Sequence, residues 1–334
     1  MFAGTKSDRG LAEGAYDMLT GNSFAFDWEV QLMSWLQSRL GEAGISIVSF
    51  FSAFGEELIL IVIMGFLYWC YNKQIGKRIG TQVLMGLVWN PMIKNVFLRR
   101  RPYFDHEDIR IYRIVEPEAD PLDIAAQGFS FPSGHSTNAA IVYGSLALML
   151  KKKWMMMLAF LVPLLVGLSR IVVGAHFPTD VMAGWFLGLL AVGAVNWLRR
   201  KLRNDRLFYG VLLLSALPGL FYCKSNDYYS GLGLMIGFFA GILLEEHRVR
   251  FANTRNPLRA VLRILGGGVL FFCLNQGLKL PFSEAFLESG SLGARLVRMI
   301  RYAVVAFVEF GVYPLLFNWA GKRFPDATAV SRQG

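Results

Sequence analysis

The chain has 334 residues, of which 54% are hydrophobic and 17% charged, and its formal net charge is +10. A mean hydropathy of +0.41 excludes an ordinary soluble domain and is typical of a protein that crosses a membrane several times. The basic residues border apolar runs, as they do in the cytoplasmic loops of membrane proteins. We therefore expect a membrane bilayer, and no nucleic acid, as the partner of this positive charge.

The N-terminal segment combines a polar tail with a pattern that predicts an amphipathic helix. Residues 1–23 contain glycine and mixed charges, and they predict a poorly ordered tail without a cleavable signal peptide. Over 26–41, one set of apolar residues recurs at helical spacing and polar residues occupy the opposite face. The apolar set is Trp28, Leu32, Trp35, Leu36 and Leu40, and the polar set is Glu29, Gln31, Gln37 and Arg39. Such a helix either lies in the membrane interface or packs on the helix bundle.

Long apolar runs follow, each near the length that a bilayer core requires. They lie at about 45–71, 80–98, 135–150, 154–173, 180–198, 207–223, 229–244, 258–277 and 300–319. The sequence thus predicts an all-α, polytopic membrane helix bundle of about nine transmembrane helices, with an N-terminal amphipathic interfacial helix. Glu56 and Glu57 interrupt the first run, and Gly233, Gly237 and Gly241 in the seventh predict close contact between helices.

We divide the predicted bundle into three parts. Residues 1–44 form the tail and amphipathic helix, 45–200 a helical core, and 201–334 a C-terminal extension of four membrane helices. The loops after the first, third, fifth, seventh and ninth runs are short and basic, which predicts that they are cytoplasmic. The segment 99–134 then lies outside, although the basic cluster Arg99–Arg101 breaks the rule there.

One short stretch, residues 169–180, places a cation, an imidazole and a carboxylate between two apolar runs. Arg170 is costly at membrane depth, and charged residues at such positions usually mark a site. His176 and Asp180 are four residues apart, so a helical turn places them on one face. A carboxylate beside an imidazole fixes its tautomer and stabilises the imidazolium. The alternative is an arginine at a helix end followed by an ordinary polar loop.

Two further groups fall on the same predicted side of the membrane. They are Lys94 with Arg101-Pro102, and Pro132-Ser133-Gly134-His135 at the start of an apolar run. Lysine and arginine side chains can hold phosphoryl oxygens, and a helix N-terminus is an anion site. Two histidines allow one to attack phosphorus and the other to protonate the leaving oxygen. The spacing to Asp180 favours His176 as the nucleophile. No cluster of carboxylates suggests Mg²⁺ ligands, so we expect chemistry without a metal or cofactor.

These three groups, in this order and at these spacings, resemble the type 2 phosphatidic acid phosphatase superfamily over about residues 45–200. The resemblance implies that His176 forms a phosphohistidine, that Asp180 orients and charges it, and that His135 protonates the leaving alkoxide. It implies that the phosphoryl oxygens are held by Lys94, Arg101, Ser133, Gly134 and Arg170. Phe54-Gly55-Glu56-Glu57 with Tyr68-Trp69 is loosely similar to the sphingosine 1-phosphate phosphatase branch, which often has threonine where this chain has Gly134.

The resemblance predicts a multi-pass lipid phosphate phosphatase of the bacterial cell membrane, with its active site on the outer side. Its substrate would be a lipid phosphomonoester or diphosphate, such as a long-chain-base phosphate, phosphatidic acid or a polyprenyl diphosphate. A lipid phosphotransferase and a transporter of a phosphorylated lipid are the alternatives. A transporter usually contains discontinuous spans in paired halves, which this sequence lacks. A haloperoxidase that uses the same pocket is disfavoured by the membrane setting.

The sequence carries no signal for an oligomeric state. For Arg99 and Arg100, contact with a second phosphate or lipid head group is one interpretation, and an ordinary interfacial role is the other.

Overall fold

The structure is a computed structural model that describes residues 21–113 and 119–323. Within these ranges, the chain is helical apart from its loops and one isolated bridge between Asn22 and Arg99. The all-α fold class is therefore confirmed for the described residues. Most of the tail predicted over 1–23 lies outside them.

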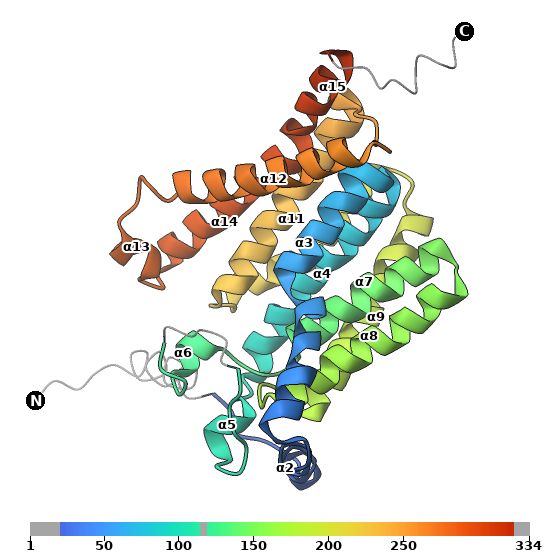
Figure 1. Cartoon of the computed structure of the whole chain (residues 1–334). Helices are drawn as coiled ribbons and strands as arrows, with labels where there is room; N and C mark the ends of the chain where they lie inside the picture. The colour runs from blue at the N-terminus through green and yellow to red at the C-terminus, as the bar shows by residue number, and fades with distance from the viewer. Residues whose placement is uncertain (1–20, 114–118, 324–334) are drawn as a thin grey trace, which may run out of the picture. The chain divides into compact units, whose positions relative to one another are not determined.

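The chain packs into two compact units, each built from two separate stretches of sequence. Unit 1 comprises residues 1–56 and 92–190, and unit 2 comprises 57–91 and 191–334. Helices α4 (Lys73–Phe97) and α9 (Pro178–Lys201), which are labelled in Figure 1, contribute residues to both units. The other described helices of unit 1 are α2 (Asp27–Ser49), η1 (Phe50–Gly55), α5 (Pro102–Asp105), α6 (Ile124–Gln127), α7 (Gly134–Leu150) and α8 (Lys153–Val172). Those of unit 2 are α3 (Glu57–Phe66), η2 (Leu67–Tyr71), α10 (Asp205–Ala216), η3 (Leu217–Phe221), α11 (Asn226–Leu244), η4 (Glu245–Val249), α12 (Pro257–Gly277), α13 (Glu284–Glu288), α14 (Leu292–Phe307), η5 (Val308–Val312) and α15 (Pro314–Arg323).

Five helical segments in the described part of the chain are long and apolar enough to cross a membrane. They are Lys153–Val172, Pro178–Lys201, Asn226–Val249, Pro257–Gly277 and Leu292–Ala320, and a sixth is added if the bent pair Asp27–Gly55 and Ile59–Tyr71 is one span. The chain is thus a multi-pass membrane protein, but the prediction of about nine spans is not confirmed. Helix α7 has 17 residues and α10 has 12, which is short for a bilayer core. Helix α4 has 25 residues, but its first turns carry the charged side chains of Lys73, Lys77 and Arg78, which are unfavourable inside a bilayer.

Helix α2 differs from its predicted form in length and in the side that faces the protein. It continues to Ser49 across a break at Gly41, whose φ of 60° and ψ of −179° favour glycine. The predicted first span is divided by η1, after which Glu56 has extended backbone. The buried residues of α2 are Glu29, Met33, Gln37 and Ile45, and the exposed ones include Trp28, Leu32 and Trp35. Thus α2 packs on unit 1 through a face that includes two polar side chains, and its tryptophans point outward.

In unit 1, α7 is almost completely buried over its first four turns and packs against α8 and α9. The backbones of α7 and α9 approach closely where α9 has glycines. A Cβ atom at Gly184 would lie 2.6 Å from the carbonyl oxygen of Ser133, and one at Gly188 would lie 2.7 Å from that of Thr137. This approach holds the N-terminus of α7 beside the first turn of α9, where residues of two predicted motifs meet.

In unit 2, the glycines of α11 face α14, as the sequence predicts for a small-residue stripe. A Cβ atom at Gly233 would lie 2.2 Å from the carbonyl oxygen of Met299, and one at Gly237 would lie 2.0 Å from that of Ala303. The stripe is therefore used for packing within the chain.

We expect Gly188→Ala to lower the thermal stability of the purified protein, because a methyl group cannot fit against a backbone oxygen. Overpacking of this kind costs about 1–3 kcal/mol. Gly193→Ala on the same helix is the matched control, since nothing lies within 4 Å of its added Cβ. Alanine is the better helix former, so the control should match or exceed the wild-type melting temperature. Equal melting temperatures for the two variants would contradict the close approach.

Candidate active site

The first predicted motif lies where α4 ends and the chain turns into the loop before α5. Lys94 is in the last turn of α4, and Leu98 just beyond the helix has a left-handed φ of 50°. Arg101 is the N-cap residue of α5, and Pro102 occupies its first turn, where the fixed φ of proline suits a helix start. The motif therefore spans a helix end and the next helix beginning.

Arg101 is buried and fixed by backbone carbonyl groups of two other loops. Its Nε donates to the carbonyl oxygens of Gln127 and Gly128 at 2.9 and 3.1 Å, and its Nη1 donates to that of Ala175 at 3.0 Å. These acceptors carry no net charge. These three contacts fix the position of the guanidinium within the site.

The second motif forms the N-terminus of α7. Ser133 is its N-cap residue, and the hydroxyl accepts from the Ser136 backbone amide at 3.4 Å and contacts the Ser136 hydroxyl at 3.0 Å. The Ser133 amide donates to the carbonyl oxygen of Asp180 at 2.9 Å, which joins the second motif to the third. Gly134 and His135 begin the helix, where unpaired backbone amides and the helix dipole favour an anion.

Arg170 is in the last turn of α8 and is 3% exposed. Its Nη1 donates to the hydroxyl of Ser52 at 3.3 Å, and that hydroxyl lies 2.8 Å from the Ser169 hydroxyl. The Nε of Arg170 and the hydroxyl of Tyr103 are both buried without a hydrogen-bond partner among the described residues. Burial raises the pKa of Tyr103, while the positive charges of Arg101 and Arg170 oppose that shift, so this phenol lies among the cations of the site.

His176 lies in the short turn between α8 and α9 and is 2% exposed. Its Nδ1 is 2.8 Å from the carbonyl oxygen of Ser130. Because a carbonyl oxygen can only accept, Nδ1 carries the proton and Nε2 of the neutral ring keeps its lone pair. Burial holds the pKa of His176 well below its ordinary value, and the charges of Arg101, Arg170 and Lys94 act in the same direction. Burial and these cations therefore favour the neutral imidazole, which is the form in which a ring nitrogen can act as a nucleophile.

Asp180 lies 3.6 Å from His176, measured from Oδ2 to Nδ1, so its carboxylate is close to the ring while Ser130 is the direct hydrogen-bond acceptor. Its carboxylate has other partners. Oδ2 accepts from the Phe177 amide at 2.8 Å, and Oδ1 accepts from Arg99 Nη1 at 2.6 Å.

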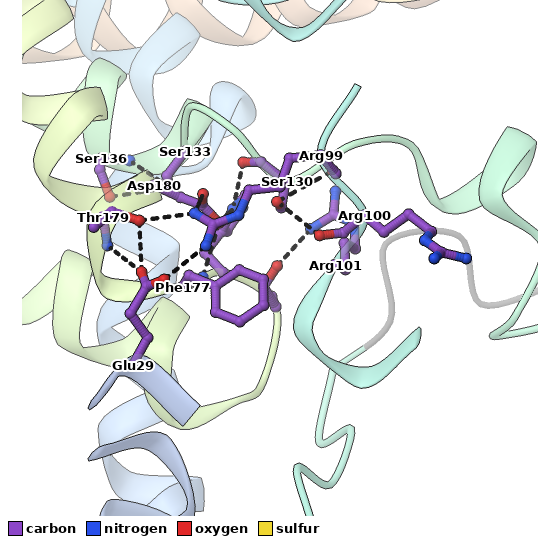
Figure 2. A network of polar contacts seen from close by, with 12 residues as sticks. Glu29, Arg99, Arg100, Arg101, Ser130, Ser133, Ser136, Phe177, Thr179 and Asp180 are labelled. Atoms are coloured by element: carbon purple, nitrogen blue, oxygen red, sulfur yellow. Dashed lines mark hydrogen bonds and ion pairs between the residues drawn. The ribbon is translucent and has the colours of Figure 1, made fainter. Parts of the chain in front are cut away.

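Arg99 is the centre of a buried polar network (Figure 2). The side chain is 1% exposed and donates to Asp180, to Glu29 Oε2 at 2.7 Å, to the Thr179 hydroxyl at 2.7 Å and to the carbonyl oxygen of Phe24 at 2.9 Å. These internal contacts replace the contact with a second phosphate or lipid head group that the sequence suggested. Arg100 forms an ion pair with Asp105 at 2.9 Å.

The structure brings the predicted site residues of all three motifs together in unit 1. Lys94, Arg101, Arg170 and His135 each act electrostatically on His176. Ser133 and Gly134 begin the helix that Asp180 contacts through its backbone. In the described residues, no three His, Cys, Asp or Glu side chains gather as a potential set of metal ligands.

Sequence reasoning did not identify several polar residues of the site. They are Glu29, Ser52, Tyr103, Ser130 and Thr179. Two had a local signal, because Tyr103 follows Arg101-Pro102 and Thr179 precedes Asp180. Glu29 had no local signal, since it lies 150 positions before Thr179 in the sequence.

Two protein-family profiles match the chain. Residues 57–204 match the profile described as PAP2 superfamily, and 229–323 match that of the transmembrane extension of PAP2 superfamily phosphatases. The first range includes every predicted site residue. No solved structure gives a significant match.

Three characterised relatives are similar to parts of the chain. Phosphatidylglycerophosphatase B of Bacillus subtilis is 41% identical over 101 residues, which are 28% of this chain and 49% of the relative. Undecaprenyl-diphosphatase of Sulfolobus acidocaldarius is 28% identical over 175 residues, 52% of this chain and 79% of the relative. Lipid A 1-phosphatase of Rhizobium etli is 32% identical over 127 residues, 36% of this chain and 51% of the relative. The chain thus spans about half the length of the first and third relatives.

We expect Tyr103→Phe to weaken binding of an oxyanion such as vanadate without lowering the melting temperature. The change removes only a hydroxyl that has no partner in the described residues, so the folded state loses no hydrogen bond. One hydrogen bond to a charged ligand contributes about 1.5–3 kcal/mol, so the inhibition constant should rise about tenfold or more. Tyr112→Phe, on a half-buried tyrosine of the neighbouring loop, is the control. Unchanged vanadate binding by Tyr103→Phe would contradict a role in the anion site.

Proposed function

Because the chain belongs to the PAP2 superfamily, we propose that it hydrolyses a lipid phosphomonoester or diphosphate through a phosphohistidine at His176. One observation carries the proposal. The ring of His176 has its Nδ1 proton on the Ser130 carbonyl group, which leaves Nε2 as a nucleophile among Lys94, Arg101 and Arg170. Three cations near a neutral imidazole favour attack on a phosphate dianion, since they offset the repulsion between the electron pair and the anion.

In the first step, the Nε2 lone pair of His176 attacks phosphorus and the bond from phosphorus to the lipid oxygen breaks. Before substrate binds, burial and the surrounding cations hold the pKa of His135 well below its ordinary value. A phosphate dianion among those cations raises that pKa, so His135 takes up a proton and gives it to the lipid oxygen, because an alkoxide is a poor leaving group. In the second step, His135 takes a proton from water, the oxygen attacks phosphorus, and the bond to Nε2 breaks. Asp180 offsets the charge of the phosphorylated ring. We assign the phosphoryl oxygens to Lys94, Arg101, Arg170 and the amides of Ser133 and Gly134.

The relatives suggest the range of substrates to examine. Their names specify phosphatidylglycerophosphate, undecaprenyl diphosphate and the 1-phosphate of lipid A, all of them phosphorylated lipids. We propose a substrate of this class for the present chain, with hydrolysis independent of a metal ion. The looser likeness to the sphingosine 1-phosphate phosphatase branch remains a prediction. We also propose that the protein lies in the bacterial cell membrane with its active site on the outer side. Residues 45–200 would form the phosphatase core, and 201–334 its C-terminal membrane extension.

A phosphate-release screen of the purified protein tests the proposal. It should cover phosphatidylglycerophosphate, undecaprenyl diphosphate, a lipid A 1-phosphate, phosphatidic acid and sphingosine 1-phosphate, each with and without EDTA. Turnover of at least one lipid in EDTA is the expected result, and vanadate should inhibit it competitively because its trigonal-bipyramidal form resembles phosphoryl transfer. A strict requirement for Mg²⁺, or no release from any phosphorylated lipid, would contradict the proposal.

We expect His176→Ala to abolish turnover while the protein stays folded. Loss of a covalent nucleophile should lower kcat by about 10⁴ or more. With a ³²P-labelled lipid, the wild type should give an acid-labile, base-stable phosphoenzyme and His176→Ala none. His247→Ala, at an exposed histidine of unit 2, should label normally. Near-normal phosphate release by folded His176→Ala would exclude the assigned role.

We expect the effect of His135→Ala to depend on the leaving group. A lipid alkoxide needs a proton in the transition state, whereas an activated aryl phosphate leaves without one. General-acid catalysis contributes about 10²–10⁴-fold, so the loss should be of that order for the lipid and much smaller for the aryl ester. The measurement compares kcat/KM for both substrates in the same detergent. Equal losses would mean that His135 mainly binds phosphate.

A further inference from the structure

Glu29 is a buried carboxylate that none of the three motifs contains. It is 0% exposed, lies in the first turn of α2, and precedes the range 57–204 that matches the family profile. Oε1 accepts from the Thr179 amide at 3.0 Å and the Thr179 hydroxyl at 2.5 Å, and Oε2 accepts from the Phe26 amide at 3.0 Å and Arg99 at 2.7 Å. A carboxyl group that accepts four hydrogen bonds is held in its ionised form.

Arg99 divides its positive charge between two carboxylates. Nη2 contacts Glu29 at 2.7 Å and Nη1 contacts Asp180 at 2.6 Å, and all three side chains are at most 1% exposed. One cation and two anions give this buried group a net charge of −1. The nearest part of it to the nucleophile is Oδ2 of Asp180, 3.6 Å from Nδ1 of His176.

The reaction needs that negative charge. When Nε2 forms its bond to phosphorus, Nδ1 keeps its proton on the Ser130 carbonyl group, so the ring of His176 becomes positive. A net charge of −1 beside the ring stabilises it. Without the charge of Glu29, Arg99 would pair with Asp180 alone and the group would be neutral.

We propose that Glu29 is a positioning residue for catalysis: by drawing the charge of Arg99 away from Asp180, it keeps the Asp180 carboxylate effective toward His176. The inference rests on the proposed function, because it needs His176 as the nucleophile. Helix α2 is then part of the catalytic machinery, although it lies outside the matched core.

The alternative is that Glu29 only fastens α2 to unit 1. Charge distinguishes the two. Removing the Glu29 charge takes the group from −1 to 0, removing the Arg99 charge takes it to −2, and removing both restores −1. A fastening role predicts that all three changes damage the site in the same direction, whereas the electrostatic role predicts opposite effects of the single changes and compensation in the double change.

The pH dependence of kcat/KM is a suitable readout, because the variants leave the other titratable and charged neighbours of His176 in place. These neighbours are Lys94 of α4, Arg101 before α5, His135 of α7, Arg170 of α8 and Asp180 of α9. A more negative surrounding raises the imidazole pKa, and a less negative one lowers it. The acid limb of kcat/KM therefore reports the charge of the group.

The experiment uses the full-length protein with the best lipid of the screen and ³²P labelling of His176. Glu29→Gln should lower kcat by about 10- to 100-fold with KM changed less than about threefold, and it should move the acid limb to lower pH. Arg99→Gln should move the limb to higher pH, and the double variant should return it toward the wild-type position. Glu42→Gln, at an exposed position of α2, should behave as wild type.

The outcomes distinguish a failure of the proposed function from a failure of the role proposed for Glu29. If wild-type protein releases no phosphate and takes no label on His176, the proposed function is wrong. If the wild type is labelled normally and Glu29→Gln matches it in kcat and pH profile, only the inference is wrong. Shifts in the same direction for Glu29→Gln and Arg99→Gln would also overturn it. If Arg99→Gln does not fold, Glu29→Gln still decides the matter, because a kcat loss without a pH shift supports mere fastening.

Discussion

A buried guanidinium must be surrounded by acceptors, and satisfying Arg99 determines how the parts of unit 1 meet. Its four donated hydrogen bonds reach the segment before α2 at Phe24, α2 itself at Glu29, and the first turn of α9 at Thr179 and Asp180. Removing one partner of a buried ion pair leaves an uncompensated charge, which costs about 3–5 kcal/mol. The chain therefore has little freedom to place the third motif elsewhere, and the rigidity that the chemistry needs follows from this constraint.

Backbone groups connect the motifs to one another. The Ser133 amide donates to the Asp180 carbonyl group, Arg101 donates to that of Ala175, and His176 donates to that of Ser130. Because these acceptors belong to the main chain, the connections depend on loop geometry more than on the side chains in the loops. Arg101 and His176 are thus oriented by uncharged main-chain groups of neighbouring segments.

The sequence can point to a candidate site where its residues are close in the chain, and not where they are distant. The candidate residues from Lys94 to Asp180 stand in short motifs at helix ends, so their types and spacings suffice to single them out. Arg99 was noticed because it breaks the charge rule for loops, but its partners are internal and no local pattern names them. Glu29 contacts Thr179 across 150 positions, and that contact exists only once α2 has packed. Similarly, hydropathy finds apolar runs, but the helix that forms in one of them, α7, has only 17 residues and is buried along most of its length, which hydropathy alone does not show.

The orientation of α2 shows why an amphipathic pattern alone is ambiguous in a membrane protein. In water, the polar face of a helix is the exposed face, and the apolar face is buried. Next to a bilayer, an apolar face can remain on the outside, and in this structure Trp28, Leu32 and Trp35 are on the outside of the protein. The polar face is then available to the interior, where a carboxylate is stable only if it finds donors. Glu29 finds them at Arg99 and at the amino end of α9, so an outward apolar face and an inward charge are two consequences of one helix position.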